Sequence, residues 1–477
     1  MASMLIEGST DPLPGIFVPL ISGTVSIIIN NYSTRLKDQL NRVVEYSMIV
    51  KKNEQMLHSL AYYDSLTGLP NKKTLMDQIE MLQKRSNVFY LVYMDVDNLK
   101  KVADTLGRSI CDAVLQSVAQ RWKQYCRDED LLARVGFSEF VILICRDADT
   151  EDIRSYLRGF CDALKEPVCI GHKEFQMHVL FGVAKYPNHG ASAEELLGNA
   201  DIALVKAKKL GMNVCQFFSN TLGDEAKRKD RLENDLAYAI QNNELFLVYQ
   251  PHYCCGSFEP RGFEALARWN HPELGVISPV EFIPIAEETG MINDIGRWAI
   301  EAALNTLAEL RDKANINTVI SVNLSVKQLL DPLFAARVSG FLKKTGLDSG
   351  YLEFEMPETV FASDCGDVIG VLNQLKNMGI GLAVDDFGKR TPSLNDLRAM
   401  PVNLLKIDKA MIDRTALSDR MTEAIVAFAH TLGLKVAAKG VEQVQQLEYL
   451  SAKGCDYAQG YFLSRPVSKD QISNVYS

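Results

Sequence analysis

Residues 435–442 read KVAAKGVE, a short apolar run that ends in a lysine, a glycine and a glutamate. Seven further apolar runs lie between residues 245 and 464, and helical patterns separate most of them. They are LFLVYQ (245–250), GFEALARW (262–269), VISVNLS (319–325), LEFEMPE (352–358), GLAVDDF (381–387), LLKID (404–408) and YAQGYFLS (457–464). Eight strand–helix units over about 240 residues predict a TIM-like (β/α)8 barrel across residues 235–477.

Polar side chains interrupt or end these runs, where a barrel of this type carries its chemistry. They are Gln250, Glu264, Asn323, Glu355, Asp385, Asp386, Lys406, Glu442 and Gln459. Any one of them could be a satisfied polar group within the core. Because they come from eight strands that converge, we predict that they form one site.

The overall composition limits the classes of function. A chain of 477 residues predicts two or three domains, and 47% apolar with 23% charged residues is typical of globular proteins. The net charge of −9 argues against broad nucleic-acid binding, so we expect no nucleic-acid partner. The ten cysteines form no CxxC pair, which favours reduced thiols in the cytoplasm.

Residues 1–30 form an apolar N-terminal segment with two interpretations. The uncharged stretch 13–29 is 17 residues long, somewhat shorter than a membrane-spanning helix. Basic residues follow it, which suits an anchor to the cytoplasmic face of the inner membrane. It could equally be a remnant or a surface-packed apolar segment. Leucines and valines at near-helical spacing predict one connecting helix over 31–62, which could dimerise.

A first folded domain is expected over residues 63–218. FYLVYMDVD (89–97) predicts a buried strand that ends in Asp95 and Asp97, and LLARVGFSEFVILI (131–144) predicts a β-hairpin. Two carboxylates opposite a hairpin turn could bind a metal and a phosphate, or could be a solvated strand end. A charged linker, placed at 219–234, separates this domain from the barrel.

Four ordered blocks of the first domain resemble the GGDEF family of diguanylate cyclases. They are YDSLTGLPNKK (63–73), MDVDNLKKVADTLGRSICDAVL (94–115), RDEDLLARVGFSEF (127–140) and NADIALVKAKKLGMN (199–213). The resemblance implies a mixed sheet flanked by helices, so the whole chain is expected to combine α+β and α/β domains.

The active-site residues of this family are mostly replaced. The resemblance implies that Phe137 stands where a glycine lets phosphate approach, and that Ser138 replaces a metal-binding acid. Ala103 replaces an asparagine that reads guanine, and Met212 replaces an arginine near the triphosphate. Asp95 alone remains of the metal carboxylates, and it cannot bind two Mg²⁺ ions and a triphosphate. We therefore predict no cyclase activity.

A second cyclic di-GMP site is a candidate on the first domain. Arg127 and Asp130 match the RxxD inhibitory site of the family, five residues before Gly136. Arginine can bind a phosphate or guanine in bidentate fashion. The alternative is a structural ion pair at the entry to the hairpin.

The barrel resembles the EAL family of cyclic di-GMP phosphodiesterases over essentially all of 235–477. The matching motifs are YQP (249–251), EALARW (264–269), NLS (323–325), EMPE (355–358), DDFG (385–388), KID (406–408), KGVE (439–442) and AQGYFLSRP (458–466). In active members two ions, Mg²⁺ or Mn²⁺, activate the water that attacks the phosphodiester.

The resemblance implies a role for each matched position. Metal ligands would be Glu264, Asn323, Glu355 and Asp385, with Asp386 beside them and Glu442 and Lys406 completing the inner shell. Gln250 and Arg268 would contact the dinucleotide, and the ligand site would also include Leu266, Lys439 and Gln459.

Lys439 stands where active members carry a glutamate, the proposed general base. An ammonium neither accepts that proton at neutral pH nor binds a hard cation. Lys439 could pair with Glu264, Glu355, Asp385, Asp386 and Glu442 and take over part of the neutralising role of the metal. Alternatively, its long side chain could extend to solvent and leave the metal site intact. Either interpretation removes the base.

The loop after DDFG also departs from the family. Active members carry a flexible Thr-Gly-Tyr-Ser stretch that couples the metals to the dimer interface. Here residues 389–393 read KRTPS, so the glycine is absent and Pro392 stiffens the loop.

The sequence therefore favours a degenerate GGDEF–EAL protein that acts as a non-catalytic cyclic di-GMP receptor or regulator. Binding is expected to require no cofactor, with Mg²⁺ or Mn²⁺ bound weakly if at all. A homodimer and an unidentified protein effector are the expected partners. Two alternatives stay open, a weak cyclic di-GMP phosphodiesterase and a protein-interaction scaffold that binds no nucleotide.

Overall fold

The computed structural model describes residues 14–476 apart from 86, 363–365, 390–393 and 414–415. The chain divides into two units, Met1–Ala226 and Lys227–Ser477. The expected N-terminal segment at 1–30 lies partly outside the described residues, as does most of the KRTPS loop at 389–393.

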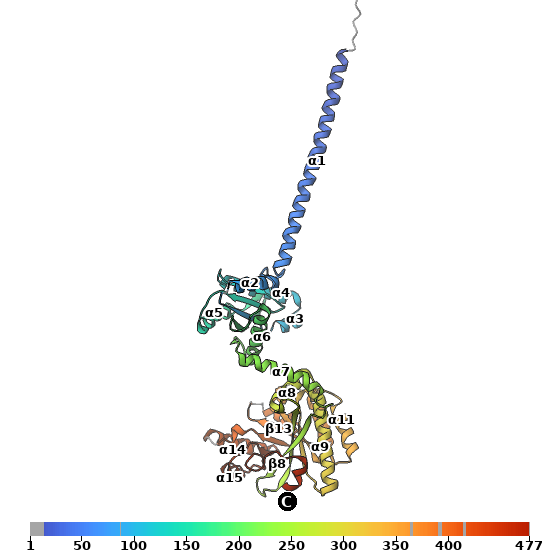
Figure 1. The fold of residues 1–477 in the computed structure, drawn as a ribbon. Helices are drawn as coiled ribbons and strands as arrows, with labels where there is room; N and C mark the ends of the chain where they lie inside the picture. Colours follow the sequence, from blue (N-terminus) through green and yellow to red (C-terminus); the bar gives the residue numbers. More distant parts are fainter. Residues whose placement is uncertain (1–13, 86, 363–365, 390–393, 414–415, 477) are drawn as a thin grey trace, which may run out of the picture. The chain divides into compact units, whose positions relative to one another are not determined.

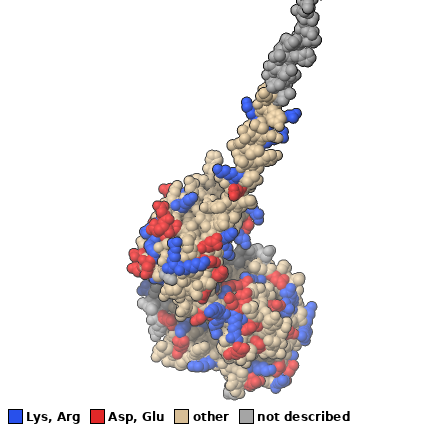
Figure 2. Space-filling view, turned by 45° about the horizontal axis from the view of Figure 1, so that its top comes forward, with Lys and Arg blue, Asp and Glu red and all other residues tan. Residues whose placement is uncertain are grey.

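A single long helix, α1 (Pro14–Tyr62), leads into the first unit (Figure 1). The connecting helix expected over 31–62 is present, and it continues upstream to Pro14. In Figure 2 the described part of α1 presents mostly uncharged surface with a few Lys and Arg side chains. No helix in the described part of the chain is both long and apolar enough to cross a membrane.

The first unit is built on a mixed five-stranded sheet in the order β2-β3-β1-β6-β7. Its strands are β1 (Phe89–Val96), β2 (Leu131–Arg134), β3 (Glu139–Ile144), β6 (Val179–Tyr186) and β7 (Cys215–Phe217), with a separate pair β4 (Val168–Ile170) and β5 (Lys173–Phe175). Its helices are α2 (Lys72–Lys84), α3 (Leu99–Leu106), α4 (Arg108–Tyr125), α5 (Thr150–Asp162) and α6 (Ala193–Leu210). The expected hairpin is formed by β2 and β3, and the central strand β1 is buried on both faces.

The second unit is a barrel with the strand order β9-β11-β12-β13-β14-β15-β16-β8, and the pairing of β8 with β9 closes it. A further short strand, β10 (Gly275–Ile277), pairs with β9. The barrel strands are β8 (Leu245–Cys254), β9 (Pro260–His271), β11 (Val319–Asn323), β12 (Leu352–Pro357), β13 (Gly381–Phe387), β14 (Leu404–Ile407), β15 (Lys435–Ala438) and β16 (Tyr457–Ala458). The helices are α7 (Asn220–Ala239), α8 (Pro279–Thr289), α9 (Ile292–Ala314), α10 (Val326–Leu329), α11 (Phe334–Thr345), α12 (Gly366–Asn377), α13 (Leu394–Ala399), α14 (Ala416–Thr431) and α15 (Val444–Ala452). The predicted fold class is therefore confirmed.

One strand departs from the eight parallel units that we expected. β8 runs antiparallel to both of its neighbours, β9 and β16, and no helix separates it from β9. The short connection between β8 and β9 explains this, because parallel neighbours need a long crossover whereas antiparallel strands need only a turn. Most of the charged linker expected at 219–234 is helical, since it lies within α7.

Strand alternation separates the core of the barrel from its polar interior. On β12, Leu352, Phe354 and Met356 are fully buried and belong to the large apolar core, where Phe354 packs on Phe334 of α11. Glu353 and Glu355 occupy the alternate positions and point to the other face of the strand. The barrel therefore carries ionisable groups along its axis.

Candidate functional site

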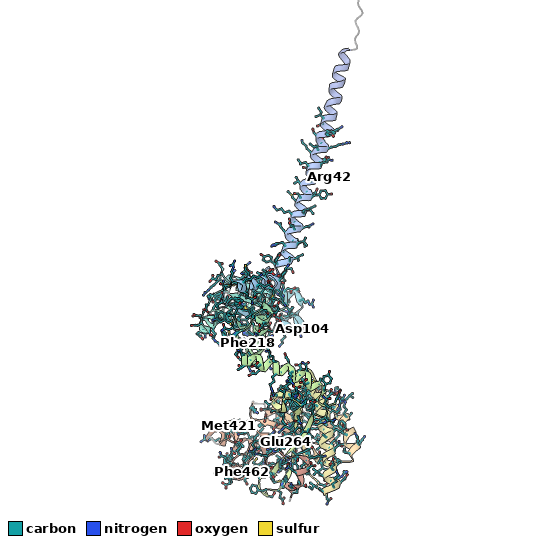
Figure 3. The ribbon with its side chains drawn as sticks, viewed as in Figure 1. Arg42, Asp104, Phe218, Glu264, Met421 and Phe462 are labelled. Atoms are coloured by element: carbon teal, nitrogen blue, oxygen red, sulfur yellow. The ribbon has the colours of Figure 1, made fainter. Side chains whose placement is uncertain are left out.

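Three carboxylates meet inside the barrel at the carboxyl ends of nearby strands. Glu264 comes from β9, Glu355 from β12 and Asp385 from β13, and their oxygens lie within 4.8 Å of one another. The parallel register places Asn323 of β11 beside Glu355, and Asn323 Nδ2 donates to Glu264 Oε1 over 2.8 Å. Figure 3 labels Glu264 within the barrel. Such a cluster of oxygen ligands could hold a metal ion.

Two ammonium groups lie among these carboxylates. Lys439, directly after β15, places Nζ 2.9 Å from Asp385 Oδ2, 3.4 Å from Glu264 Oε2 and 3.9 Å from Glu355 Oε2. Lys406 of β14 is buried and donates to Glu355 Oε1, with Glu264 Oε2 3.9 Å away. Lys439 is thus paired internally and does not extend to solvent. Three carboxylates and two ammoniums leave one negative charge in excess.

The electrostatics of the cluster follow from burial and from this charge balance. Burial opposes the charge on Lys439, but the carboxylates of Glu264 and Asp385 outweigh it and raise the pKa of Lys439 well above its ordinary value. For Glu264, burial is outweighed by Lys439 and Lys406, which hold its pKa below the ordinary value. Burial, then the neighbouring Glu264, raises the pKa of Glu355 to about 8. Of these two glutamates, Glu355 is therefore the one that takes up a proton more readily.

The ammonium of Lys439 limits what else the cluster can bind. Glu355 Oε2 and Asp385 Oδ1 are buried without a hydrogen-bond partner among the described residues, so two oxygens remain for a ligand. A divalent cation between these carboxylates would nevertheless lie within a few ångströms of the ammonium. Because like charges at that distance repel strongly in a buried site, the cluster does not fit a full metal centre while Lys439 stays there.

Two glutamines extend the cluster across the seam of the barrel. Gln459, which follows β16, donates from Nε2 to Glu264 Oε2 over 2.9 Å and to Gln250 Oε1 over 3.3 Å. Gln250 of β8 donates in turn to the Ser464 carbonyl over 3.2 Å. Although β8 is antiparallel, Gln250 lies opposite Glu264 in the β8–β9 ladder. Both glutamines are therefore held at the level of the carboxylates.

A cavity of about 500 Å³ opens beside the carboxylates. Its floor includes Asn323, Asp385 and Asp386, and apolar side chains of β9, α8 and α9 form its walls. The wall residues include Leu266, Val280, Ile283, Ile295 and Ala299. A concave apolar pocket with a few polar groups at its base is the usual form of a small-molecule site.

The carboxylate at the end of β1 in the first unit is neutralised by the protein itself. Asp95 Oδ1 accepts a hydrogen bond from Ser138 Oγ over 2.5 Å, and Asp95 Oδ2 lies 2.6 Å from Lys208 Nζ. Phe137 and Met212 are exposed to solvent near this end of the sheet. A single paired carboxylate is a poor site for two divalent ions and a triphosphate.

Comparison with known proteins identifies both units. The model of the diguanylate cyclase GGDEF domain matches residues 61–214, and the model of the EAL domain matches residues 233–466. The bifunctional diguanylate cyclase/cyclic di-GMP phosphodiesterase MucR of Pseudomonas aeruginosa is 32% identical over 464 residues, covering 96% of this chain and 67% of MucR. The chain is a tandem GGDEF–EAL protein.

Further relatives share this pair of domains or the fold. The cyclic di-GMP phosphodiesterase NbdA of P. aeruginosa is 34% identical over 421 residues, covering 86% of this chain and 53% of NbdA. The chain thus spans two thirds of MucR and about half of NbdA. The Vibrio cholerae LapD S helix-GGDEF-EAL structure, bound to c-di-GMP, superposes with a TM-score of 0.56 at 21% identity, covering 87% of this chain and 99% of that one. That likeness concerns the fold.

Two acids expected in the inner shell of the EAL domain point elsewhere. Asp386 adopts a positive φ of 53° and pairs with Lys389 Nζ at 2.7 Å. Glu442 is about half exposed and pairs with Lys409 Nζ at 2.7 Å. The expectation that both carboxylates would lie around Lys439 was wrong. Asp386 pairs with Lys389 instead, and Glu442 pairs with Lys409. Lys389 also reaches Asp408 Oδ2 at 2.9 Å and so ties β13 to the end of β14.

Arg268 keeps most of its guanidinium available at the rim of the EAL barrel. Among the described residues, the guanidinium makes one hydrogen bond, from Nη1 to the Ala267 carbonyl over 2.8 Å. Burial lowers the pKa of Arg268 from its ordinary value, but an arginine stays charged at neutral pH. Arg268 can therefore donate to an anionic ligand.

The RxxD residues of the GGDEF domain meet through their backbones, where the Asp130 amide donates to the Arg127 carbonyl over 3.1 Å, but the Asp130 carboxylate pairs with a different arginine. Asp130 is buried, pairs with Arg146 Nη1 at 3.2 Å and accepts a hydrogen bond from the Cys145 amide. Arg127 and Arg146 both stack on the Tyr156 ring, 4.8 and 4.7 Å from its centre. Asp130 thus forms a structural ion pair, with a partner that we did not predict.

Three basic residues that pair with predicted site acids were not predicted as their partners from the sequence. Lys389 and Lys409 directly follow the DDFG and KID motifs, so a search for cations next to the predicted acids could have found them. Arg146 lies 16 residues from Asp130, across the hairpin, and no local pattern signals that contact.

Proposed function

We propose that this GGDEF–EAL protein is a catalytically inactive receptor or regulator for cyclic di-GMP, with the ligand bound at the mouth of the EAL barrel. The observation that carries this proposal is the position of Lys439, 2.9 Å from Asp385 and 3.4 Å from Glu264. Hydrolysis of a phosphodiester needs a group that accepts a proton from water and cations that stabilise the developing charge. An ammonium with a raised pKa is not a base, and it competes with the cations.

The surroundings of the cluster support binding. The cavity beside the carboxylates has the apolar walls that a purine base prefers, and Arg268 can donate to a phosphate. The other proposed ligand-site residues are Gln250, Glu264, Leu266, Asn323, Glu355, Asp385, Asp386, Lys406, Lys439, Glu442 and Gln459. A related EAL enzyme, Bd1971, is described in its cAMP- and cyclic-di-GMP-bound form, and it is 26% identical with a TM-score of 0.51, covering 64% of this chain and 82% of that one.

We further propose that binding requires no divalent metal. Lys439 and Lys406 supply positive charge within the site, and three carboxylates with two ammoniums exert a weak pull on a cation. Mg²⁺ or Mn²⁺ would then bind weakly, through Glu264, Asn323, Glu355 and Asp385. The two unpartnered oxygens of Glu355 and Asp385 favour a second candidate function, a very slow phosphodiesterase that acts when an ion displaces Lys439.

Dimerisation through α1 is part of the proposal. Ile29, Leu36, Val43, Val50 and Leu57 recur every seven residues, and each is between 60 and 68% exposed, so none of the described residues covers them. Five heptads with an apolar first position favour a parallel two-stranded coiled coil between two copies. The conformational change caused by ligand binding would then be transmitted to an unidentified protein effector.

Titration calorimetry tests the proposal directly. Cyclic di-GMP is titrated into the full chain in EDTA and again in Mg²⁺, and the recovered ligand is analysed by chromatography. We expect binding of similar affinity in both buffers, with the ligand recovered intact. Binding that disappears in EDTA, or ligand recovered as the linear dinucleotide, would show that the protein is a metal-dependent enzyme.

A further inference from the structure

Two cysteine thiols meet at the seam that closes the EAL barrel, at the end opposite the carboxylate cluster. Cys255 directly follows β8, and Cys455 lies two residues before β16. In the β8–β16 ladder Cys254 lies opposite Tyr457, and the Cys255 amide donates to the Asp456 carbonyl over 3.0 Å. The backbone contact places Asp456 opposite Cys255, so Cys455, the residue before Asp456, lies one position away from Cys255. The side chains of Cys255 and Cys455 share a hydrogen bond.

The two thiols are buried, but each lies next to a solvent-exposed residue. Cys255 is 2% exposed and Cys455 is 4% exposed, but the adjacent Gly256 and Gly454 are both exposed to solvent. A small oxidant therefore needs only a local opening of the loops at the seam to reach the thiols.

The two thiols differ in character. The hydrogen bond from Cys455 lowers the pKa of the Cys255 thiol, and the same contact, with burial, raises the pKa of Cys455 well above its ordinary value. Cys455 Sγ also lies 3.3 Å from the Tyr457 carbonyl and 3.5 Å from the Val436 carbonyl, which are alternative acceptors for its single proton. The thiolate is the nucleophilic form of cysteine, so Cys255 is the group that reacts first and Cys455 is the proton-bearing neighbour.

We propose that Cys255 and Cys455 are a redox modification site that forms a reversible disulfide across the barrel seam when hydrogen peroxide is present. The Cys255 thiolate attacks one peroxide oxygen, the O–O bond breaks, and the departing hydroxide takes a proton to become water. The Cys455 sulfur then attacks the sulfenic acid of Cys255. The S–S bond forms, the S–O bond breaks, and the hydroxyl leaves as water with the Cys455 proton. The two thiols lose two electrons, and peroxide is reduced to two waters.

The crosslink would join the two strands that hold the ligand-site glutamines. β8 carries Gln250 and β16 leads into Gln459, and these side chains are hydrogen-bonded to each other. The bridge also closes a loop of about 200 residues, so it restricts the unfolded chain strongly and stabilises the barrel. This inference does not depend on whether the barrel binds cyclic di-GMP.

The test uses the full chain, reduced and then treated with graded hydrogen peroxide. Free thiols are blocked with iodoacetamide, and the unreduced peptides are mapped by mass spectrometry. We expect a Cys255–Cys455 crosslink, a higher Tm for the oxidised protein, and reversal of both by dithiothreitol. Because Cys254 shares a peptide with Cys255, the same map is made for Cys254→Ser, which should keep the crosslink and the rise in Tm.

The order of the two steps is tested with Cys455→Ser. Removal of the second thiol should leave a sulfenic acid on Cys255, detected as its dimedone adduct. If that variant fails to fold, the peptide map of the wild-type and Cys254→Ser proteins decides the question. The proposal is overturned if Cys255 and Cys455 remain alkylatable at a peroxide dose that oxidises the exposed Cys169, or if either is found linked to a different cysteine.

Discussion

Lys439 Nζ lies 2.9 Å from Asp385 Oδ2 and thereby places a protein cation among the carboxylates of the EAL barrel. Asp385 and Glu264 come from strands that β11 and β12 separate, yet the same ammonium contacts both. A buried cluster of like charges is stable only if it is neutralised, and here lysines provide that neutralisation. This contact explains why binding and hydrolysis are expected to separate in this protein.

The substitution Lys439→Glu is expected to restore some phosphodiesterase activity. The site becomes more acidic by two charge units, so its affinity for Mn²⁺ should rise. A carboxylate also returns to the position of the proposed general base, which contributes roughly 10²- to 10⁴-fold to a rate. We expect hydrolysis of cyclic di-GMP to the linear dinucleotide to become measurable by chromatography, below the rate of an active enzyme because Lys389 still holds Asp386.

Lys439→Gln is the matched control. It removes the cation without supplying a base, so metal affinity should rise while hydrolysis stays at the wild-type level. If Lys439→Glu binds Mn²⁺ tightly and remains inert, the altered loop at 389–393, and not the missing base, is the cause of inactivity.

Arg268→Ala should weaken cyclic di-GMP binding by about 1.5–3 kcal/mol, the range for a hydrogen bond to a charged group. The guanidinium donates to a single backbone carbonyl within the described residues, so its loss should leave the barrel folded. Calorimetry measures the affinity, and the Tm reports folding. Arg297→Ala, which breaks a surface pair with Asp294, is the matched control and should bind normally. Unchanged affinity in Arg268→Ala would rule out this residue as a ligand contact.

The GGDEF domain should convert no GTP to cyclic di-GMP with Mg²⁺ or Mn²⁺. Asp95, the carboxylate at the end of β1, is already paired with Ser138 and Lys208, which makes it a poor ligand for two divalent ions and a triphosphate. Chromatography of the reaction, against a heat-treated sample of the same protein, is the measurement. Product above that control would contradict the assignment of this domain as inactive.

Stability at acidic pH should depend on the buried pair formed by Arg261 and Glu353. Burial opposes the charge, but Arg261 at 2.6 Å holds the pKa of Glu353 at about 2, below the ordinary 4.5. A lowered folded-state pKa adds stability that is complete above pH 4.5 and is lost as the pH falls from 4.5 to about 2. The difference corresponds to about 3 kcal/mol.

Arg261→Met tests this linkage by urea unfolding at pH 7 and at acidic pH. Removing one partner of a buried pair leaves the other charge uncompensated, so we expect a loss of about 3–5 kcal/mol at pH 7. The loss should shrink as the pH falls, because protonation removes the stranded charge. An equal loss at every pH would mean that Arg261 acts through packing alone.

Val43→Lys on α1 should weaken dimerisation, because it places a charge at the first position of a heptad that two copies would share. Light scattering at a series of concentrations gives the mass. Asn41→Lys lies on the opposite face of the helix and should leave the dimer intact. A wild-type chain that is monomeric at all concentrations would refute the coiled coil.

Local patterns were sufficient to predict the barrel and the core of its site. Apolar runs of four to eight residues mark strands wherever they occur, and in parallel strands the polar residues at the carboxyl ends must share one end of a barrel. Glu264, Asn323, Glu355, Asp385 and Lys439 were therefore predictable as neighbours, as was the long helix before the first domain.

The tertiary structure alone decided which charge pairs with which, and how the barrel closes. Asp386 pairs with Lys389 and Glu442 pairs with Lys409, so neither carboxylate joins the cluster. Asp130 pairs with Arg146, although several other cations lie at comparable distances along the sequence. The antiparallel course of β8 brings Cys255 beside Cys455 from opposite ends of the domain. Such contacts depend on the path of the backbone and on side-chain direction in three dimensions, and sequence spacing alone does not determine either.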